Sequence, residues 1–591
     1  MAISGDEALP GDKEIEQSTF NSGSLSDGPA EGVLAAPNAA TDPTATGEAD
    51  VTTTAPTGEP LYEDGRSTLQ TVLIMVSLCS ALFLGALDVT VITVAIPTIA
   101  ADFKSTVGYT WIGSAYLLSN AATAPSWGKI SDIWGRKPVI LGAVAIFWIG
   151  SLLCAVSRNM TMLIVARAIQ GIGSGGIIIL VNVCISDLFS MRKRGQYYGF
   201  TGLVTRLVWR WCFYINLPIS GAGFILLVFV LKLHNPKTPM RAGLAAVDWL
   251  GSFAVSAGTL LVLLGLTFGD VMYPWKSGAV ISMIIIGALV LVAFAFIEAR
   301  IARYPIIPMR LFNSRVAVAS FVCCFFHGIV FVSGSYYLPL YFQAVLGATP
   351  LLSGVYVLPY SIGLSITSAA VGIAIKKTGK YLPFIIAGFV LLTAGFALFT
   401  NLGDHANWAK IILYQIVASL GVGPNFQATL LSLHTTVDRR DVASATATFG
   451  FIRQMSTTIS VVIGGVVFQN QMQQQHDKLV ASLGAEAANL LSGSNAASSV
   501  DVVASLLSGP ALQTARSAYW VAIRTMFIMY AALAGAGLIA SFFITQSTLS
   551  TEHVDHKTGL EGMRGREDDE KAAKKAKQTD GDGETGVKVE A

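Results

Sequence analysis

Thirteen apolar runs constrain the fold of this chain more than any other feature. Each run is about long enough to cross a bilayer, since about 20 helical residues at about 1.5 Å each span the hydrocarbon core. Of the 591 residues, 53% are hydrophobic and 13% are charged, which is too apolar for a soluble multidomain protein. We therefore predict an all-α polytopic membrane protein. The runs centre on 71–97, 108–127, 138–156, 161–186, 212–231, 248–268, 278–297, 316–340, 352–375, 382–400, 409–431, 443–467 and 521–544.

The basic residues between the runs predict one crossing more than the runs supply. Basic residues cluster at 129–137 and 192–194, and the positive-inside rule puts both clusters in the cytoplasm. Every later basic cluster would face outside unless the chain crosses again between Arg194 and Trp209. As a helix that segment reaches about 20 Å, short of the roughly 30 Å core, and it would bury Arg206. A fifth span near 195–208 is predicted to be defective.

Four ordered motifs resemble those of the major facilitator superfamily. They are LDVTVITVAIP (87–97), GKISDIWGRKP (128–138), RAIQGIGSGG (167–176) and WRWCFYINLPISG (209–221). Together they resemble the fourteen-span drug:proton antiporter branch, especially fungal efflux pumps for toxins and drugs, over about 70–545. The chain departs from that pattern in two places. Ile133 stands where many members have arginine, and the Gly-Pro motif of the fifth span is largely missing.

The resemblance implies a major facilitator fold, with two six-helix bundles, two inserted helices and, in this chain, thirteen recognisable spans. Alternating access would come from rocking one bundle against the other. The expected division is a disordered cytoplasmic tail (1–66), an N-terminal bundle (67–231), two inserted spans with linkers (232–315), a C-terminal bundle (316–545) and a charged cytoplasmic tail (546–591).

Intramembrane charges are the candidates for proton coupling. Asp88 lies deep in the first span and Arg167 lies within the fourth, where an isolated charge costs a few kcal/mol or more. The resemblance implies that Arg167 modulates a nearby proton site, with Gln170 one turn away. Asp88 is the candidate titrating carboxylate. The alternative is a structural ion pair or a helix cap.

The segment 128–138 is predicted to be a short gating loop formed by Gly128, Asp132, Gly135, Arg136 and Lys137. Small glycines suit a tight turn, and Asp132 can cap a helix end or pair with a basic residue. The simpler interpretation is a solvated loop that obeys the positive-inside rule.

Two further sets of residues follow from the motifs. Close helix packing in lipid is expected at four glycines of the fourth span, and the entry to the sixth span is expected at a second set. The sets are Gly171, Gly173, Gly175 and Gly176, and Trp209, Arg210, Trp211, Asn216 and Pro218.

Weaker candidates have simpler interpretations. Asp248 and Glu298 are expected to be interfacial caps, and His327 a hydrogen-bonded packing residue. Gln427 and Arg453 either line a cavity or anchor at the interface. The aromatic stretch 336–343 either lines an apolar path or forms an interfacial belt. The sequon at Asn159 lies close to the membrane.

The resemblance implies a proton-coupled secondary transporter that exports a small, fairly apolar compound such as a drug, toxin or secondary metabolite. A proton-coupled importer, for example of siderophores, and a non-transporting product of a shortened chain are the alternatives. The GIGSGG match lies inside an apolar helix, so dinucleotide binding is not expected. The sequence has no G-x-x-x-x-G-K-S/T loop, no H-E-x-x-H motif and no clustered Cys and His, so no enzyme, cofactor or metal site is expected. The expected partners are substrate, protons and the bilayer, without nucleic acid, for a monomer in the plasma membrane or, alternatively, the vacuolar membrane.

Overall fold

The computed structural model describes most of the chain between the two tails. The described residues are 69–70, 72–82, 106–188, 216–231, 238–269, 273–438, 441–491 and 507–549, with single residues 85, 88, 99, 103, 236, 496 and 500. The predicted tails, the fifth span near 195–208, and Trp209, Arg210 and Trp211 lie outside the described residues.

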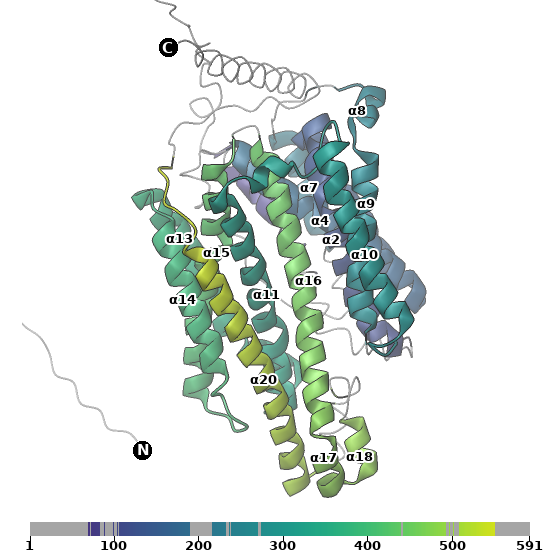
Figure 1. Ribbon diagram of the computed structural model, residues 1–591, viewed down its shortest axis with the longest axis vertical. Helices are drawn as coiled ribbons and strands as arrows, with labels where there is room; N and C mark the ends of the chain where they lie inside the picture. Colours follow the sequence, from purple (N-terminus) through teal and green to yellow (C-terminus); the bar gives the residue numbers. More distant parts are fainter. Residues whose placement is uncertain are drawn as a thin grey trace, which may run out of the picture. The chain divides into compact units, whose positions relative to one another are not determined.

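The N-terminal helices form the first part of the fold (Figure 1). They are Val72–Leu82, α2 (Thr106–Trp134), α3 (Arg136–Ala155), α4 (Met160–Leu188) and α7 (Asn216–Val230). The short helix α8 (Met240–Ala246) leads to the inserted hairpin of α9 (Trp249–Phe268) and α10 (Gly278–Arg300), and the 3₁₀ helix η1 (Met309–Phe312) follows.

The C-terminal helices complete the fold. They are α11 (Arg315–Ala344), α12 (Pro350–Tyr356), α13 (Leu358–Thr378), α14 (Leu382–Phe399), α15 (Trp408–Thr436), α16 (Val442–Gln474), α17 (His476–Leu483), α18 (Ala485–Leu490) and α20 (Gly509–Ser541). All named elements within the described residues are helical, so the prediction of an all-α protein is confirmed.

Each of the thirteen predicted spans coincides at least in part with a described helix. Ten of the described helical segments are long and apolar enough to cross a membrane. The other three predicted spans match Val72–Leu82, α7 and α2. The predicted span 352–375 is interrupted at Val357, where α12 gives way to α13. These helices support a multi-pass membrane protein.

The predicted gating loop at 128–138 is not a loop. Residues 128–134 are the last turns of α2, and α3 begins at Arg136. Gly135 alone separates the helices, with φ 90° and ψ 157°, a region almost closed to residues that carry a Cβ. The prediction of a loop was wrong because one glycine is enough to reverse the chain here.

Helix α4 packs tightly between α2 and α3, and its glycines make this possible. A Cβ on Gly175 would lie 2.9 Å from the Asn120 carbonyl oxygen of α2. A Cβ on Gly176 would lie 2.7 Å from the Ala143 Cβ of α3. Added Cβ atoms on Gly171 and Gly173 would collide with the backbones of α2 and α3 respectively. Small residues therefore allow the close helix approach that is usual in membranes.

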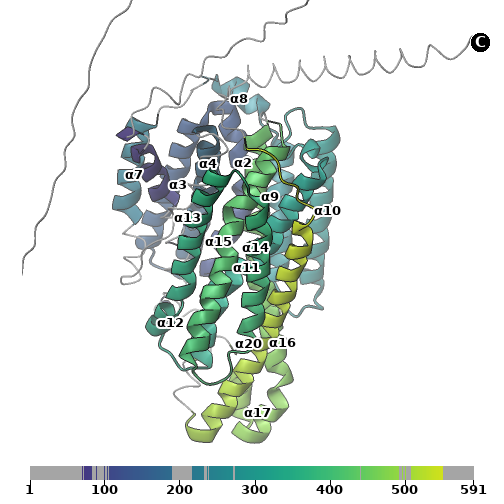
Figure 2. The ribbon, with the colours of Figure 1, turned by 90° about the vertical axis from the view of Figure 1, so that its left-hand side faces the viewer.

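Helix α16 joins the C-terminal helices to the rest of the fold. It packs against α11 and α20 on one side and against α2, α4 and α9 on the other. Figure 1 shows α16 between these groups, and Figure 2 shows the long helices α16 and α20 side by side.

The helix ends that flank residues 189–215 lie at opposite ends of the bundle. We call the end that holds Gly135 the inner end, since the basic residues predict that it faces the cytoplasm. Near the end of α4, Ile185 shares an apolar cluster with Val139 at the start of α3. The Lys137 ammonium donates to the Val228 carbonyl near the end of α7, at 2.7 Å. Helix α7 therefore also ends on the inner side, and its first residue lies about 18 Å away towards the outer side.

Candidate functional site

Three of the predicted residues form one buried cluster among the N-terminal helices. An Arg167 guanidinium nitrogen donates to Asp88 Oδ2, and the same nitrogen donates to Gln170 Oε1 at 2.7 Å. The Gln170 amide nitrogen donates to Asp88 Oδ1 and to the Ser151 hydroxyl, both at 2.8 Å. Arg167 Nε donates to the Ile112 carbonyl at 3.1 Å. Asp88, Arg167 and Gln170 are each at most 1% exposed.

Tyr116 of α2 completes this cluster and was not predicted. The Arg167 guanidinium carbon lies 4.3 Å from the centre of the Tyr116 ring, a cation–π contact. The Tyr116 hydroxyl donates to the Ser174 hydroxyl at 2.6 Å and lies 3.3 Å from the Gly85 carbonyl oxygen. These contacts of the Tyr116 hydroxyl thus hold the Tyr116 ring in place against the Arg167 guanidinium.

Arg167 has neutral partners besides Asp88. They are the Gln170 oxygen, the Ile112 carbonyl and the Tyr116 ring. Arginine keeps its charge in proteins, so a buried guanidinium needs such partners. The protein therefore solvates the Arg167 charge through more than the ion pair alone.

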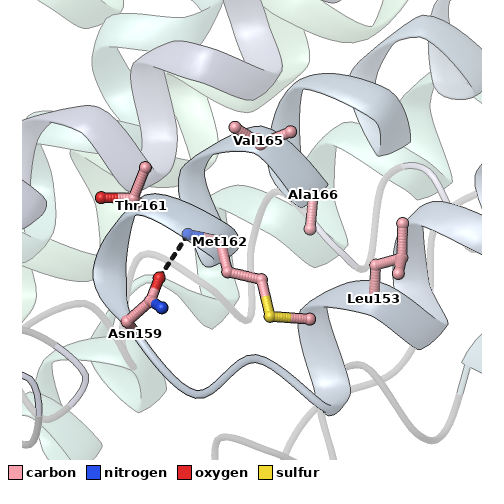
Figure 3. Close-up of a pocket in the computed structure, with 6 residues that line it drawn as sticks. All are labelled: Leu153, Asn159, Thr161, Met162, Val165 and Ala166. Atoms are coloured by element: carbon pink, nitrogen blue, oxygen red, sulfur yellow. Dashed lines mark hydrogen bonds between the residues drawn. The ribbon is translucent and has the colours of Figure 1, made fainter.

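An apolar cluster lies between the buried charges and the outer end of α3 and α4. Its buried members are Ile99, Ile112, Cys154, Ala155, Leu163 and Ala166. A pocket of about 440 Å³ opens beyond it, lined by Leu153, Asn159, Thr161, Met162, Val165 and Ala166. Figure 3 shows the Met162 backbone N–H donating to the side-chain Oδ1 of Asn159, at 2.8 Å. Asn159 of the sequon therefore caps the start of α4.

Neutral contacts join α16 to the N-terminal helices. The Gln454 amide donates to Asn120 Oδ1 of α2 at 2.6 Å. Nearer the inner end, a Cβ on Gly450 would lie 3.1 Å from Ile179 Cγ1 of α4, and a Cβ on Gly128 would lie 2.5 Å from the Ala447 Cβ. Helix α16 therefore packs directly against α2 and α4 near the inner end.

Two charged residues of 128–138 pair within the α2–α3 corner. Asp132 Oδ1 and an Arg136 guanidinium nitrogen form an ion pair at 2.6 Å, and both side chains are almost fully buried. The same nitrogen donates to the Ser131 hydroxyl at 2.7 Å. Of the alternatives for Asp132, the structure shows pairing with a basic residue. Ile133, where the resembled family often has arginine, is buried in an apolar cluster with Ala246.

Two of the weaker candidates differ in outcome. Asp248 caps α9 by accepting the Gly251 N–H at 2.9 Å, as predicted. Glu298 is not an interfacial helix cap. It is 4% exposed and accepts the backbone N–H groups of Ile306 and Ile307, beyond the end of α10. The prediction was wrong because the chain folds back onto Glu298, which its position in the sequence does not reveal.

Polar residues of the C-terminal helices are embedded in aromatic packing. His327 is buried, its Nε2 lies 3.0 Å from the Val422 carbonyl oxygen, and its ring contacts Phe331 and Phe426. It is therefore a hydrogen-bonded packing residue, as expected. The Arg453 guanidinium lies over the rings of Phe426 and Phe449.

Gln427 is half-buried within α15. In the stretch 336–343, Tyr337 and Tyr341 belong to the C-terminal core and Tyr336 is exposed. Asn216 begins α7, and Pro218 in its first turn is exposed.

Comparison with known proteins gives matches over most of the chain. The family model described as Major Facilitator Superfamily matches residues 78–208 and 200–461, two segments that meet in the join where a span is predicted to be missing. "Efflux pump dotC" of Dothistroma septosporum is 46% identical over 517 residues, covering 85% of this chain and 89% of that protein. "MFS-type transporter ppz2" of Metarhizium majus is 46% identical over 511 residues, covering 84% and 88%.

Solved structures agree on the fold. The chain is similar to the MFS proton:xylose symporter XylE, with a TM-score of 0.50 and 15% identity, covering 81% of this chain and 97% of XylE. At this identity the likeness concerns the fold alone.

Proposed function

This chain belongs to the Major Facilitator Superfamily of membrane transporters, in the efflux branch that its motifs resemble, and we propose that it exports a small, fairly apolar compound in exchange for protons. The observation that carries the proposal is the buried cluster of Asp88, Arg167 and Gln170. An intramembrane ion pair is costly to maintain and is expected where a transporter moves protons.

The direction of transport is proposed from the relatives. One of them is named an efflux pump, and it matches along most of this chain. This favours export over the import alternative. The apolar nature of the substrate rests on resemblance to the drug efflux branch.

We propose that Asp88 carries the proton in the following cycle. A proton from the outer side neutralises Asp88, which weakens its bond to Arg167 while Gln170, Ile112 and Tyr116 keep the arginine in place. Release of the proton to the inner side restores the pair. The apolar cluster beside Ala166 lies between Asp88 and the outer pocket, so closure on that side limits proton leakage.

Inside-out vesicles with an acidic lumen test this function. Rhodamine 6G serves as the probe, and a pH-sensitive dye in the lumen reports proton movement. We expect the probe to accumulate as lumenal protons leave. Asp88→Asn should lose accumulation against a gradient while keeping exchange of labelled for unlabelled probe. Asn182→Ala, a polar change on α4 whose amide bonds its own helix at Ile178, is the matched control and should behave like the parent.

Three outcomes oppose the proposal. Accumulation by Asp88→Asn at the parental level would place the coupling elsewhere. Proton-driven uptake of the probe by intact cells would indicate import. If the folded chain moves no probe but moves it once a complete fifth span is inserted near 195–208, this polypeptide is a shortened, inactive form.

A further inference from the structure

An apolar junction at the inner end brings together the three parts of the fold. Its buried residues come from N-terminal helices, the inserted hairpin, the linker after α10, and α16. They are Ala124 and Ile179, Val183, Ala254 and Val255, Phe294, Ile306 and Ile307, Ala443, Ala447 and Phe451. The linker residues are the members that do not come from a helix.

The linker isoleucines are buried although they lie in a non-helical segment. Ile306 is 3% exposed and Ile307 is 5% exposed. Buried backbone N–H groups outside a helix need an acceptor from elsewhere. Glu298 supplies both acceptors, since Oε1 accepts the Ile306 N–H and Oε2 accepts the Ile307 N–H, each at 3.2 Å.

Helix α9 leaves space for this carboxylate. A Cβ on Gly251 would lie 2.9 Å from Glu298 Oε1, so the glycine allows Glu298 to lie against α9. The Asp248 carboxylate and the Lys129 ammonium are close enough to act on Glu298 electrostatically. Burying a carboxylate to hold two loop N–H groups is costly, which points to a purpose for the loop position.

The same linker is fixed at its far end to α16. Arg310 of η1 donates to both carboxylate oxygens of Asp441, at 2.6 and 2.7 Å. Asp441 is the N-cap residue of α16, the helix that packs against α2 and α4. Residues 301–312 thus connect the inserted hairpin, through Glu298, to the start of the helix that closes the inner end.

We propose that the linker is a latch for the inner gate, and that Glu298 is its positioning residue. The linker latch consists of Ile306 and Ile307, held by Glu298, together with Arg310, held by Asp441. With the isoleucines in the junction, α16 is braced against α2 and α4 and the inner side is closed. Inner opening requires the isoleucines to leave. This role needs alternating access but neither proton coupling nor a direction of transport.

Distances between paired spin labels test the latch in nanodiscs, without substrate or pH gradient. In a cysteine-free background, labels at Pro138 and Lys380 report the inner side, and labels at Val156 and Ala406 report the outer side. All four positions are exposed. Glu298→Leu removes both acceptors at similar volume. We expect it to raise the ratio of inner-open to inner-closed molecules roughly tenfold, with a smaller rise for Glu298→Gln, which keeps one acceptor oxygen.

Two further variants make the test decisive. The double variant Ile306→Ala and Ile307→Ala leaves Glu298 in place and should give the same shift, and it decides the question if Glu298→Leu fails to fold. Ser277→Ala removes the cap at the outer end of α10, where the Ser277 hydroxyl accepts the Val280 N–H at 3.3 Å. It should lower thermal stability without changing the inner distances. Parental distances in the folded latch variants, or an equal shift in Ser277→Ala, would overturn the proposal. Asp88→Asn can fail its own test without affecting this one.

Discussion

Gly128 of α2 lies against Ala447 of α16 so closely that a Cβ on Gly128 would stand 2.5 Å from the Ala447 Cβ. This contact lies between the N-terminal helices and the C-terminal helices, near the inner end. Gly128, which was predicted as part of a gating motif, is thus a point of close contact between the N-terminal and C-terminal helices.

Gly128→Ala should force α2 and α16 apart. Overpacking of this kind costs about 1–3 kcal/mol, enough to change the inner-open population about tenfold. We expect longer distances between the inner spin labels and slower probe transport. Adding Ala447→Gly to Gly128→Ala removes the opposing methyl and should restore both. Unchanged distances in Gly128→Ala, or failure of the second change to restore them, would argue against a gate contact here.

Arg167→Lys should reduce transport at least tenfold with normal amounts of protein in the membrane. A lysine keeps the charge but cannot reach Asp88, Gln170, the Ile112 carbonyl and the Tyr116 ring together, because it lacks the planar guanidinium. Probe transport at several pH values measures the loss. Tyr116→Phe is the companion variant, since it keeps the ring and should retain more activity than Tyr116→Leu. Parental transport by Arg167→Lys would mean that a simple charge suffices.

Asp404, in the outer connection between α14 and α15, should add stability that depends on pH. Hydrogen bonds, first that from the Ser517 hydroxyl and then that from His405, hold its pKa below the ordinary value of 3.8. The carboxylate therefore stabilises the fold above pH 3.8, and this contribution is lost as the pH falls through the lower folded pKa.

The matching experiment is thermal unfolding of Asp404→Asn and the parent in detergent. We expect a lower Tm for the variant at pH 7, by an amount that corresponds to less than about 1 kcal/mol, because the Asp404 side chain is 30% exposed and solvent screens its interactions. The difference should shrink as the medium is acidified below pH 3.8. A difference that is constant across pH would rule out the charge as its source.

Epitope tags inserted at 235 and 378 should both be reached from the cytoplasm. The end of α7 lies at the inner end, where Lys137 bonds the Val228 carbonyl. The end of α13 adjoins Tyr381, whose hydroxyl meets Thr435 Oγ1 at the end of α15, and α16 begins there and meets α2 through Ala447 and Gly128. A tag at Ala406, between α14 and α15, should be reached from outside. Antibody labelling of intact and permeabilised cells gives the answer. Outside labelling at both 235 and 378 would mean that the join does not cross and that the downstream helices are inverted.

Gly135→Ala should destabilise the protein by about 1–3 kcal/mol, because φ 90° with ψ 157° is almost reserved for glycine. Thermal unfolding measures the loss. Gly379→Ala is a control with φ 70° in a more accessible left-handed region, and it should cost less. Equal losses at the two positions would show that the α2–α3 corner relaxes.

The sequence predicted those features that depend on local pattern or on the cost of charge in lipid. Apolar runs located every described spanning helix. The cost of charge in lipid marked Asp88 and Arg167 as residues that need partners, and the ion pair that they form was the alternative to a proton-coupling role. Tyr116 was missed because a tyrosine in an apolar helix carries no sign of which charge it will face. Glu298 was misread because its partners, Ile306 and Ile307, reach it only after the linker reverses direction. Such contacts follow from tertiary folding, which spacing along one chain does not encode.

The one-residue corner at Gly135 also limits how this protein can move. With no slack between α2 and α3, and with Asp132 bonded to Arg136 across the corner, neither helix end can swing independently. Lys137 extends the same restraint to the end of α7. The corner therefore does not act as a hinge. The inner ends of α2, α3 and α7 must move together as one rigid unit, and the bending that accompanies this motion must occur deeper in the membrane.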